Sequence, residues 1–260
     1  MIDRIKDIVL KASALMVDAG FTTEAKGDDV ANIVTSSDVA VQEYLCRELK
    51  GILPESGFIC EEEDAHDPDS GYVWVIDPID GTANYARGME YCAISVALRR
   101  DGETVLGVVY SPWKREMYWA ERGKGAFLNG KPINVSKRTF KEGILCAALC
   151  TYHKEHSQAC ADILLEAFQQ CNDFRRFGSA AMELCSLAKG FSDLYFEMIL
   201  QPWDYAAAIL IIEEAGGIVT NLSDAHPSYN GPDLICGANN PENHASLLAI
   251  IRKHIHVRPY

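Results

Sequence analysis

The sequence predicts a layered fold of the α/β or α+β class, formed by residues 1–260 as one unit. Helix-like and strand-like segments alternate before residue 91 and again after Val135, which is typical of sheets covered by helices. Between them, residues 91–127 form short β-rich runs separated by Asp-Gly, Ser-Pro and Gly-x-Gly turns, which predict an antiparallel meander. No internal repeat or long linker is visible, so we expect two lobes, about 1–140 and 141–260, within a single unit.

The first elements follow from hydrophobic spacing. Apolar residues recur at three- and four-residue steps over residues 3–19, which predicts an amphipathic helix. Residues 22–32 are too polar to contribute to a core. A second helix is expected over residues 37–50, and short apolar runs predict strands at 58–60 and 73–76.

The remaining elements combine the meander with a second helix–strand alternation. Asn240-Pro241 supplies an N-cap and a first-turn proline for the last helix, and Gly216-Gly217 ends the helix before it. We expect meander strands near 93–98, 104–110 and 116–121, later strands near 144–149, 191–196, 217–220 and 233–236, and helices near 156–171, 179–189, 203–215 and 241–254.

Composition excludes several classes of protein. The net charge is −13 and no basic stripe is visible, which argues against a nucleic-acid partner. Charged residues interrupt the first twenty positions, and no long uncharged apolar run exists elsewhere, so we expect neither a signal peptide nor a membrane span. The nine cysteines are scattered without a Cys-x-x-Cys motif, which predicts buried, reduced thiols in a cytoplasmic protein.

Carboxylates stand where apolar runs become polar. Glu61 follows Phe-Ile-Cys, Asp77 follows Val-Trp-Val-Ile, and Asp204 begins a helix after Pro-Trp. Asp80 opens a Gly-Thr turn after Pro78. Several buried anions need counter-charge, and Mg²⁺ prefers oxygen ligands of this kind together with a substrate phosphate. Two such cations about 3.5–4 Å apart would clamp the attacking and leaving oxygens of a phosphate ester.

Each carboxylate also has an ordinary interpretation. The Glu61–Glu63 run alone is typical of a solvated acidic surface. Asp77 and Asp80 alone fit a turn, and Asp204 alone fits a helix N-cap. Only their combination indicates a phosphatase that depends on magnesium.

Two spaced motifs carry a resemblance to a known family. Asp77-Pro-Ile-Asp80-Gly-Thr82 resembles the first signature of the inositol monophosphatase family, and Trp203-Asp204-Tyr-Ala-Ala-Ala with Glu214-Ala-Gly-Gly217 resembles the second. Two signatures in the right order are far more specific than one short motif. Supporting stretches occur in order and extend the resemblance over nearly the whole chain: Val34–Asp38, Phe58–Glu62, Lys124–Gly130 and Phe177–Ala181.

The resemblance implies a fold and an activity. The family has a five-layer αβαβα sandwich, shared with fructose-1,6-bisphosphatase, and its members are usually homodimers. It implies hydrolysis of a small phosphorylated polyol or sugar, above all myo-inositol monophosphate, with two or three Mg²⁺ ions per site and sensitivity to lithium.

The resemblance also implies residue roles. Glu61, Asp77 and the Ile79 carbonyl would hold the first metal, whereas Asp77, Asp80 and Asp204 would hold the second. Thr82 and Glu61 would activate the attacking water, with Asp38 orienting the Thr82 hydroxyl. The remaining assigned residues would bind substrate: the Gly81 and Thr82 amides the phosphate, and Gly178, Ser179, Ala180, Glu197 and Asp204 the ring or its hydroxyls.

The substrate stays open at this point. Cys60 stands where glycine is common in the family, Asn32 where aspartate is, and residues 147–152 match poorly. Lys26 could approach the metals, and Arg175-Arg176 could meet a second phosphate or pair with acidic neighbours. Fructose 1,6-bisphosphate, NADP, histidinol phosphate and 3′-phosphoadenosine 5′-phosphate remain alternatives, as does a metal-responsive binding protein without turnover.

Overall fold

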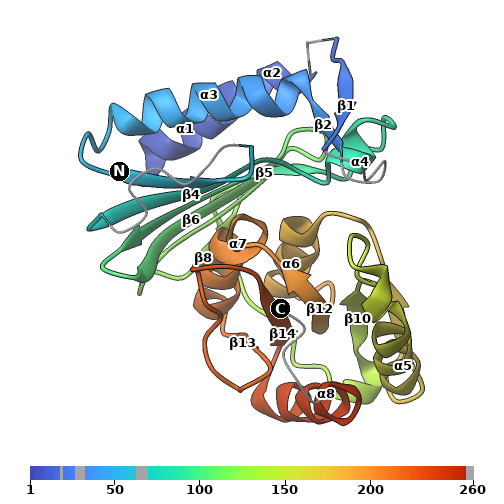
Figure 1. Ribbon diagram of the computed structural model, residues 1–260. Helices are drawn as coiled ribbons and strands as arrows, with labels where there is room; N and C mark the ends of the chain where they lie inside the picture. Colours follow the sequence, from blue (N-terminus) through green and yellow to red (C-terminus); the bar gives the residue numbers. More distant parts are fainter. Residues whose placement is uncertain (18–19, 27–32, 63–69, 256–260) are drawn as a thin grey trace.

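The computed structural model describes residues 1–17, 20–26, 33–62 and 70–255. Helices and sheets alternate in five layers, as Figure 1 shows: a pair of long helices, a seven-stranded sheet, two central helices, a five-stranded sheet, and two outer helices. The predicted α+β class with an αβαβα layer order is therefore confirmed. Asn32 and Glu63 lie outside the described residues.

The first layer contains α1 (Ile2–Ala12), α2 (Ala14–Val17) and α3 (Ser36–Lys50). The single helix predicted over 3–19 is wrong, because the chain breaks at Ser13, whose hydroxyl donates to the Leu10 carbonyl over 2.7 Å. Helix α3 starts with a capping box in which Thr35 and Asp38 bond each other's backbone and side chain. This box fixes Asp38 at the helix start, where it is fully buried.

The seven-stranded sheet has the order β3-β4-β5-β6-β7-β8-β9. Only β3 and β4 are parallel; the later pairs form the predicted antiparallel meander, which continues beyond residue 121 into a hairpin. Its strands are β3 (Gly57–Cys60), β4 (Tyr72–Asp80), β5 (Ala93–Arg100), β6 (Glu103–Ser111), β7 (Glu116–Glu121), β8 (Ala126–Leu128) and β9 (Lys131–Ile133).

Strand β4 is longer than predicted and runs through Pro78. The turn that Asp77 and Asp80 alone would fit is therefore not formed: Asp77 pairs with Ser95 and Asp80 with Ala93, with an irregularity in register between them. Proline cannot donate to the ladder and is found in sheets at such irregularities. The strand ends at Gly81, and the four-residue helix α4 (Thr82–Tyr85) follows.

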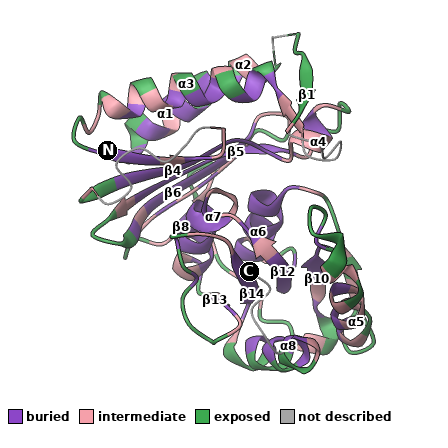
Figure 2. Cartoon of the chain, viewed as in Figure 1, coloured by how far each residue is buried: buried purple, intermediate pink, exposed green. Residues whose placement is uncertain are grey.

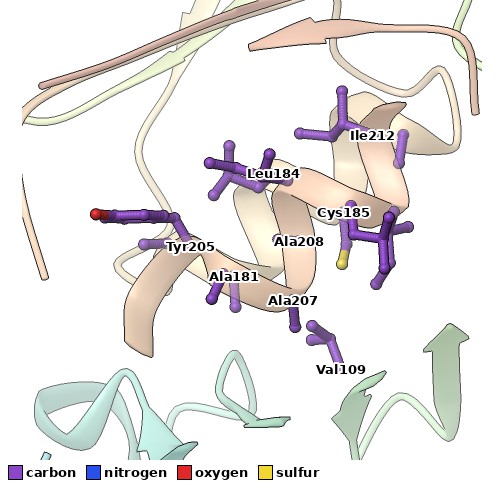
Figure 3. Close-up of a cluster of buried hydrophobic side chains, with 14 of the residues drawn as sticks. Val109, Ala181, Leu184, Cys185, Tyr205, Ala207, Ala208 and Ile212 are labelled. Carbon is purple, nitrogen blue, oxygen red and sulfur yellow. The ribbon is translucent and has the colours of Figure 1, made fainter. Parts of the chain in front are cut away.

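The central layer consists of α6 (Ala180–Ala188) and α7 (Pro202–Glu214). The apolar run at 205–212 is buried all round, as expected for a helix between two sheets. Alanines let α7 approach its neighbours closely. Figure 3 shows the hydrophobic cluster around the central helices, with Ala181 of α6 and Ala207 and Ala208 of α7, near Val109 of β6. Figure 2 shows that α6, α7 and the sheets are mostly buried, whereas the outer helices are exposed on one side.

The five-stranded sheet has the order β11-β10-β12-β14-β13. Outer helices α5 (Ser157–Phe168) and α8 (Pro241–His254) cover its far face, and α8 begins with the predicted Asn240 cap and Pro241. Its strands are β10 (Ile144–Ala147), β11 (Asp173–Arg175), β12 (Leu194–Leu200), β13 (Ile218–Thr220) and β14 (Asp233–Ala238). Single 3₁₀ turns lie at Phe140–Glu142 and Lys154–His156.

Three local details differ from or add to the predictions. The polar stretch after Thr22 stays out of the core as expected but contains an exposed strand, β1 (Thr23–Ala25), which pairs with β2 (Ile33–Thr35). The strand predicted at 191–196 starts only at Leu194, because Asp193 turns inward to accept a hydrogen bond from the Ile144 amide at 2.9 Å. The helix predicted near 156–171 ends earlier, at Phe168. It is followed by the strand β11, which was not predicted because its residues show no apolar pattern.

Among the described residues, no helix is both long enough and apolar enough to cross a membrane. All nine cysteines are reduced thiols, seven of them buried, as their scattered positions predict.

Candidate active site

The carboxyl end of β4 opens into a cavity of about 490 Å³. Segments far apart in the sequence meet there: β4, α4, residues 150–153, the loop before α6, and the junction of β12 with α7. Asp38 and Ser179 are buried and do not line the cavity. The other residues singled out from the sequence all line it: Glu61, Asp77, Ile79, Asp80, Gly81, Thr82, Gly178, Ala180, Glu197 and Asp204.

Asp77, Asp80 and Asp204 form an acidic cluster on the cavity wall. Each offers one carboxylate oxygen, and the three oxygens lie within 4.8 Å of one another. Asp77 and Asp80 come from the irregular end of β4, whereas Asp204 is the third residue of α7, where its carboxylate accepts a hydrogen bond from the Gln201 amide at 2.7 Å. Asp204 is thus part of a helix capping box and of the acidic cluster at once.

The cluster strongly disfavours its own ionisation. Burial, together with the charges of Glu61, Asp80 and Asp204, raises the pKa of Asp77 well above its usual range. Burial raises the pKa of Asp80 to about 6, although hydrogen bonds from Ser179 and the Ala180 and Ala181 amides oppose the shift. Burial and the charge of Asp80 also raise the pKa of Asp204. Without a cation, the folded protein must hold protons in this cluster or bear the repulsion.

The metal-free protein is therefore expected to lose stability as the pH rises from about 4 to about 6. In that window the folded state binds more protons than the unfolded chain, so the free energy of unfolding falls with rising pH. Asp80, with a pKa of about 6 against 3.8, accounts for up to about 3 kcal/mol at about 1.4 kcal/mol per unit. Thermal unfolding in a chelator across this range measures the effect. Asp80→Asn should flatten the pH profile; an unchanged profile would contradict the assignment.

Glu61 borders the cluster and is paired with a lysine. Lys26 Nζ donates to Glu61 Oε1 at 2.9 Å and to Glu62 Oε1 at 2.8 Å. Burial alone would lower the pKa of Lys26, but the two glutamates raise it overall, so the side chain stays charged. Burial and the charge of Glu61 raise the pKa of Glu62 to about 7. Lys26 therefore lies at the edge of the cavity beside Glu61, and it is a cation that already neutralises Glu61.

Thr82 connects the cavity to buried Asp38. Its hydroxyl lies 3.0 Å from Asp38 Oδ1 and 3.0 Å from the Ile79 carbonyl, and its single hydrogen is shared between these acceptors. Asp38 is held in turn by the Thr35 amide at 2.8 Å and by the Thr35 hydroxyl at 2.5 Å. The Thr82 oxygen keeps lone pairs that can accept a hydrogen bond from a molecule in the cavity.

Asp80 joins the two halves of the site. The Ala180 and Ala181 amides donate to its carboxylate at 3.0 and 2.8 Å, and the Ser179 hydroxyl donates to the same group. Ser179 also caps α6. The sequence assigned Ser179 and Ala180 to substrate, but the structure directs the Ser179 hydroxyl and the Ala180 amide to Asp80. Gly178 and Ala180 both line the cavity.

Gly81 makes the turn from β4 into α4. Its φ of +93° lies in the left-handed region, and a Cβ there would stand 3.0 Å from the Gly178 carbonyl oxygen. Helix α4 has only four residues, so its dipole contributes little to anion binding. The residues whose amides are predicted to bind phosphate, Gly81 and Thr82, lie in a short turn at 81–84 that lines the cavity.

Glu197 lies on β12, at an irregularity in the pairing of β12 with β14 between Glu197 and Leu200. The Tyr195 hydroxyl donates to Glu197 Oε2 at 2.8 Å, and the carboxylate is only 7% exposed. Burial raises the pKa of Glu197, and the nearby charge of Arg176 opposes the shift.

Sequence reasoning missed several residues around the cavity. Asn84 Nδ2 donates to the Tyr91 and Phe177 carbonyls at 2.8 and 2.7 Å and so fastens the loop before α6 to the first sheet. Buried Glu183 accepts from the Phe177 and Gly178 amides at 2.6 and 2.8 Å and shapes the same loop. Both are polar residues at helical positions near a signature, and only tertiary contacts distinguish them from exposed ones. Residues 150–152, the end of the segment 147–152 whose sequence matched the resemblance poorly, form part of the wall together with His153.

The donor set fits divalent cations. One oxygen of Asp77 is buried and, among the described residues, has no hydrogen-bond partner. A buried carboxylate oxygen without a donor is costly unless a cation takes the donor's place. Clustered carboxylates with a backbone carbonyl close by are the ligands that Mg²⁺ prefers. Fold and site thus define a layered α+β protein whose cavity can hold metal ions beside a bound molecule.

Comparison with known proteins agrees with this class. Residues 4–256 match the inositol monophosphatase family. Nus factor SuhB from Vibrio cholerae is 36% identical over 234 residues, which cover 89% of this chain and 86% of that protein. The chain therefore belongs to the inositol monophosphatase family.

Solved structures of related proteins have the same fold. Extragenic suppressor protein suhB from Bartonella henselae matches with a TM-score of 0.90 at 30% identity, over 98% of this chain and 99% of that one. SaIMPase-II bound to inositol monophosphate matches with a TM-score of 0.81 at 26% identity, over 97% and 93% of the two chains. A structure of SaIMPase-II with 2′AMP matches with a TM-score of 0.77 at 25% identity, over 97% and 96%.

Proposed function

We propose that the protein hydrolyses a small phosphomonoester, with myo-inositol monophosphate as the reference substrate, and that it uses Mg²⁺. The observation that carries the proposal is the cluster of buried Asp77 and Asp80 with half-buried Asp204 beside Glu61, in a cavity that also contains the turn at Gly81 and Thr82. Membership of the inositol monophosphatase family supports the same activity. The complete carboxylate set argues against a binding protein without turnover.

In the proposed mechanism, the metal ions would be held by Glu61, Asp77, the Ile79 carbonyl, Asp80 and Asp204. Bound Mg²⁺ supplies charge for the phosphate oxygens and lowers the pKa of water. Thr82 donates to Asp38 and accepts a hydrogen bond from the attacking water, which Asp38 thereby orients through Thr82. Glu61 takes a proton from that water. The Gly81 and Thr82 amides face the phosphate, so catalysis depends on position and electrostatics rather than on a nucleophilic side chain.

Phosphate release with and without Mg²⁺ tests this proposal. The substrates are inositol 1-phosphate, fructose 1,6-bisphosphate, NADP, histidinol phosphate and 3′-phosphoadenosine 5′-phosphate. Turnover of inositol 1-phosphate that requires Mg²⁺ and is inhibited by lithium would support it. Turnover of another ester alone would retain the mechanism and change the substrate, which the binding of both inositol monophosphate and 2′AMP by SaIMPase-II makes a real alternative. Failure on every ester would contradict the proposed activity.

Glu197→Gln is expected to reduce kcat/KM for inositol 1-phosphate about 10- to 100-fold, because the buried carboxylate would lose charge-assisted hydrogen bonds from ring hydroxyls. An aryl phosphate has no such hydroxyls, so its turnover should change much less. Steady-state kinetics on the two esters measure the difference. An equal loss on both would count against contact between Glu197 and the ring.

A second role is favoured by the names of related proteins. Proteins 36% and 34% identical to this chain, from Vibrio cholerae and Escherichia coli, are called Nus factor SuhB. We propose that this chain can also act as a Nus factor. The test is complementation of a host that lacks its Nus factor SuhB, by the wild-type chain and by Asp77→Asn. Rescue by both would support a role without turnover, and rescue by neither would contradict it.

We further propose a cytoplasmic homodimer that binds no membrane and no nucleic acid directly. Phe174, Phe177 and Phe191 are 39%, 38% and 67% exposed, which is unusual for aromatic side chains so close in sequence. Light scattering that gives the mass of one chain would contradict the dimer.

A further inference from the structure

Arg176 is a charged residue on the cavity wall that the proposed mechanism does not use. It follows β11 and precedes the loop that Asn84 and Glu183 hold in place. Its neighbour Arg175 points elsewhere: it bonds Asp173 at 2.5 Å and the Phe174 carbonyl at 2.7 Å, and it lines a different cavity. Of the adjacent arginines, only Arg176 shares a cavity with Glu197 and the acidic cluster.

The guanidinium of Arg176 has hydrogen-bonding capacity to spare. Among the described residues it makes one bond, from Nη1 to Glu183 Oε1, at a long 3.4 Å. That oxygen already accepts the Phe177 and Gly178 amides at 2.6 and 2.8 Å, so it is well satisfied without the arginine. A guanidinium carries five N–H donors in a planar fork that matches a phosphate. Most of these donors therefore remain for a molecule in the cavity.

Arg176 is placed to contact the part of a substrate that lies away from the reacting phosphate. Glu197 and Arg176 line one cavity, and their charges interact. With the reacting phosphate at the Asp77–Asp80–Asp204 cluster and ring hydroxyls at Glu197, the guanidinium would face a substituent on another carbon of the same ring.

We propose that Arg176 binds a second phosphate group, so that the site favours a sugar or polyol bisphosphate over the corresponding monophosphate. This inference rests on the proposed phosphatase activity and specifies its substrate class. An arginine that only neutralised Glu183 would not discriminate between these esters, because Glu183 lies behind the loop and is fully buried.

The test compares two matched pairs of esters: fructose 1-phosphate with fructose 1,6-bisphosphate, and inositol 1-phosphate with inositol 1,4-bisphosphate. Arg176→Gln should lower the ratio of kcat/KM for bisphosphate over monophosphate about 10- to 100-fold, mainly through KM. Arg176→Lys should restore part of the ratio, because the charge remains without the fork. Arg175→Gln is the matched control and should leave the ratio unchanged.

The outcomes separate this inference from the proposed activity. If wild-type protein hydrolyses these esters but Arg176→Gln lowers kcat/KM equally for both members of each pair, or Arg175→Gln has the same effect, the role of Arg176 is contradicted and the phosphatase remains. If wild-type protein hydrolyses none of them, the proposed activity fails. Calorimetric binding of fructose 1,6-bisphosphate in Mg²⁺ then still decides on Arg176: about 10-fold weaker binding by Arg176→Gln would support it, and equal binding would overturn it.

Discussion

Asp77→Asn is expected to reduce Mg²⁺-dependent phosphate release by about 10³-fold or more while the protein stays folded. Asp77 interacts with the charges of Glu61, Asp80 and Asp204 together, so its carboxylate would contribute to holding every metal ion that the cluster binds. Losing a shared ligand removes several kcal/mol of charge stabilisation from the transition state. Unchanged turnover would contradict the site.

The same substitution should make the metal-free protein more stable, because it removes a buried charge that its neighbours repel. Thermal unfolding with chelator and with Mg²⁺ measures both effects: the midpoint without metal should rise, and the increase caused by Mg²⁺ should shrink. Asp7→Asn is the control, since Asp7 is 58% exposed and far along the chain from the site. A lower midpoint for metal-free Asp77→Asn would show that the cluster is not strained by repulsion.

Gly107→Ala is expected to destabilise the protein by about 3 kcal/mol, because it overpacks the contact between β6 and α7. A Cβ at residue 107 would lie 2.6 Å from the Ala207 carbonyl oxygen and 3.0 Å from its Cα, and neither backbone can yield without moving the helix. Since α7 carries Asp204, metal binding should weaken as well.

Chemical denaturation and Mg²⁺ titration measure these two losses. Gly71→Ala is the matched control: it lies just before β4 in the same sheet, and its Cβ would meet only Asp101 Oδ1 at 3.8 Å. The control should be neutral or slightly stabilising, through the entropy of the unfolded chain. A stability change for Gly107→Ala as small as that of the control would mean that the helix can shift freely over the sheet.

Much of the fold could be predicted because the local signals agree with one another. The meander has short β-rich runs with turn residues between them, and α8 has both its cap and its proline. β1 and β11 could not be predicted, because each has three residues and neither carries an alternating pattern. Pro78 misled the prediction at β4, since its tolerance in a strand depends on the irregular pairing with β5.

For the site, sequence reasoning identified carboxylates at the ends of apolar runs, and the structure brings Asp77, Asp80 and Asp204 together. It could not show where a polar group with two possible partners points. Ser179, which was assigned to substrate, donates its hydroxyl to Asp80, and Arg176 and Arg175 differ only through the packing around them. The roles in binding and catalysis that the sequence assigned to the site residues remain predictions.

The burial of α7 on every side has a consequence for how the site opens and closes. Its backbone amides from 205 to 212 can exchange with solvent only when the two sheets part, so we expect them among the slowest-exchanging in the molecule. β1, which leads to Lys26, is exposed along its length and should exchange rapidly. Asp204 thus belongs to a helix that we expect to be among the most protected from hydrogen exchange, and Lys26 follows a strand that we expect to be among the least protected. We therefore expect slow hydrogen exchange in the part of the site formed by α7 and faster exchange in the strand that leads to Lys26.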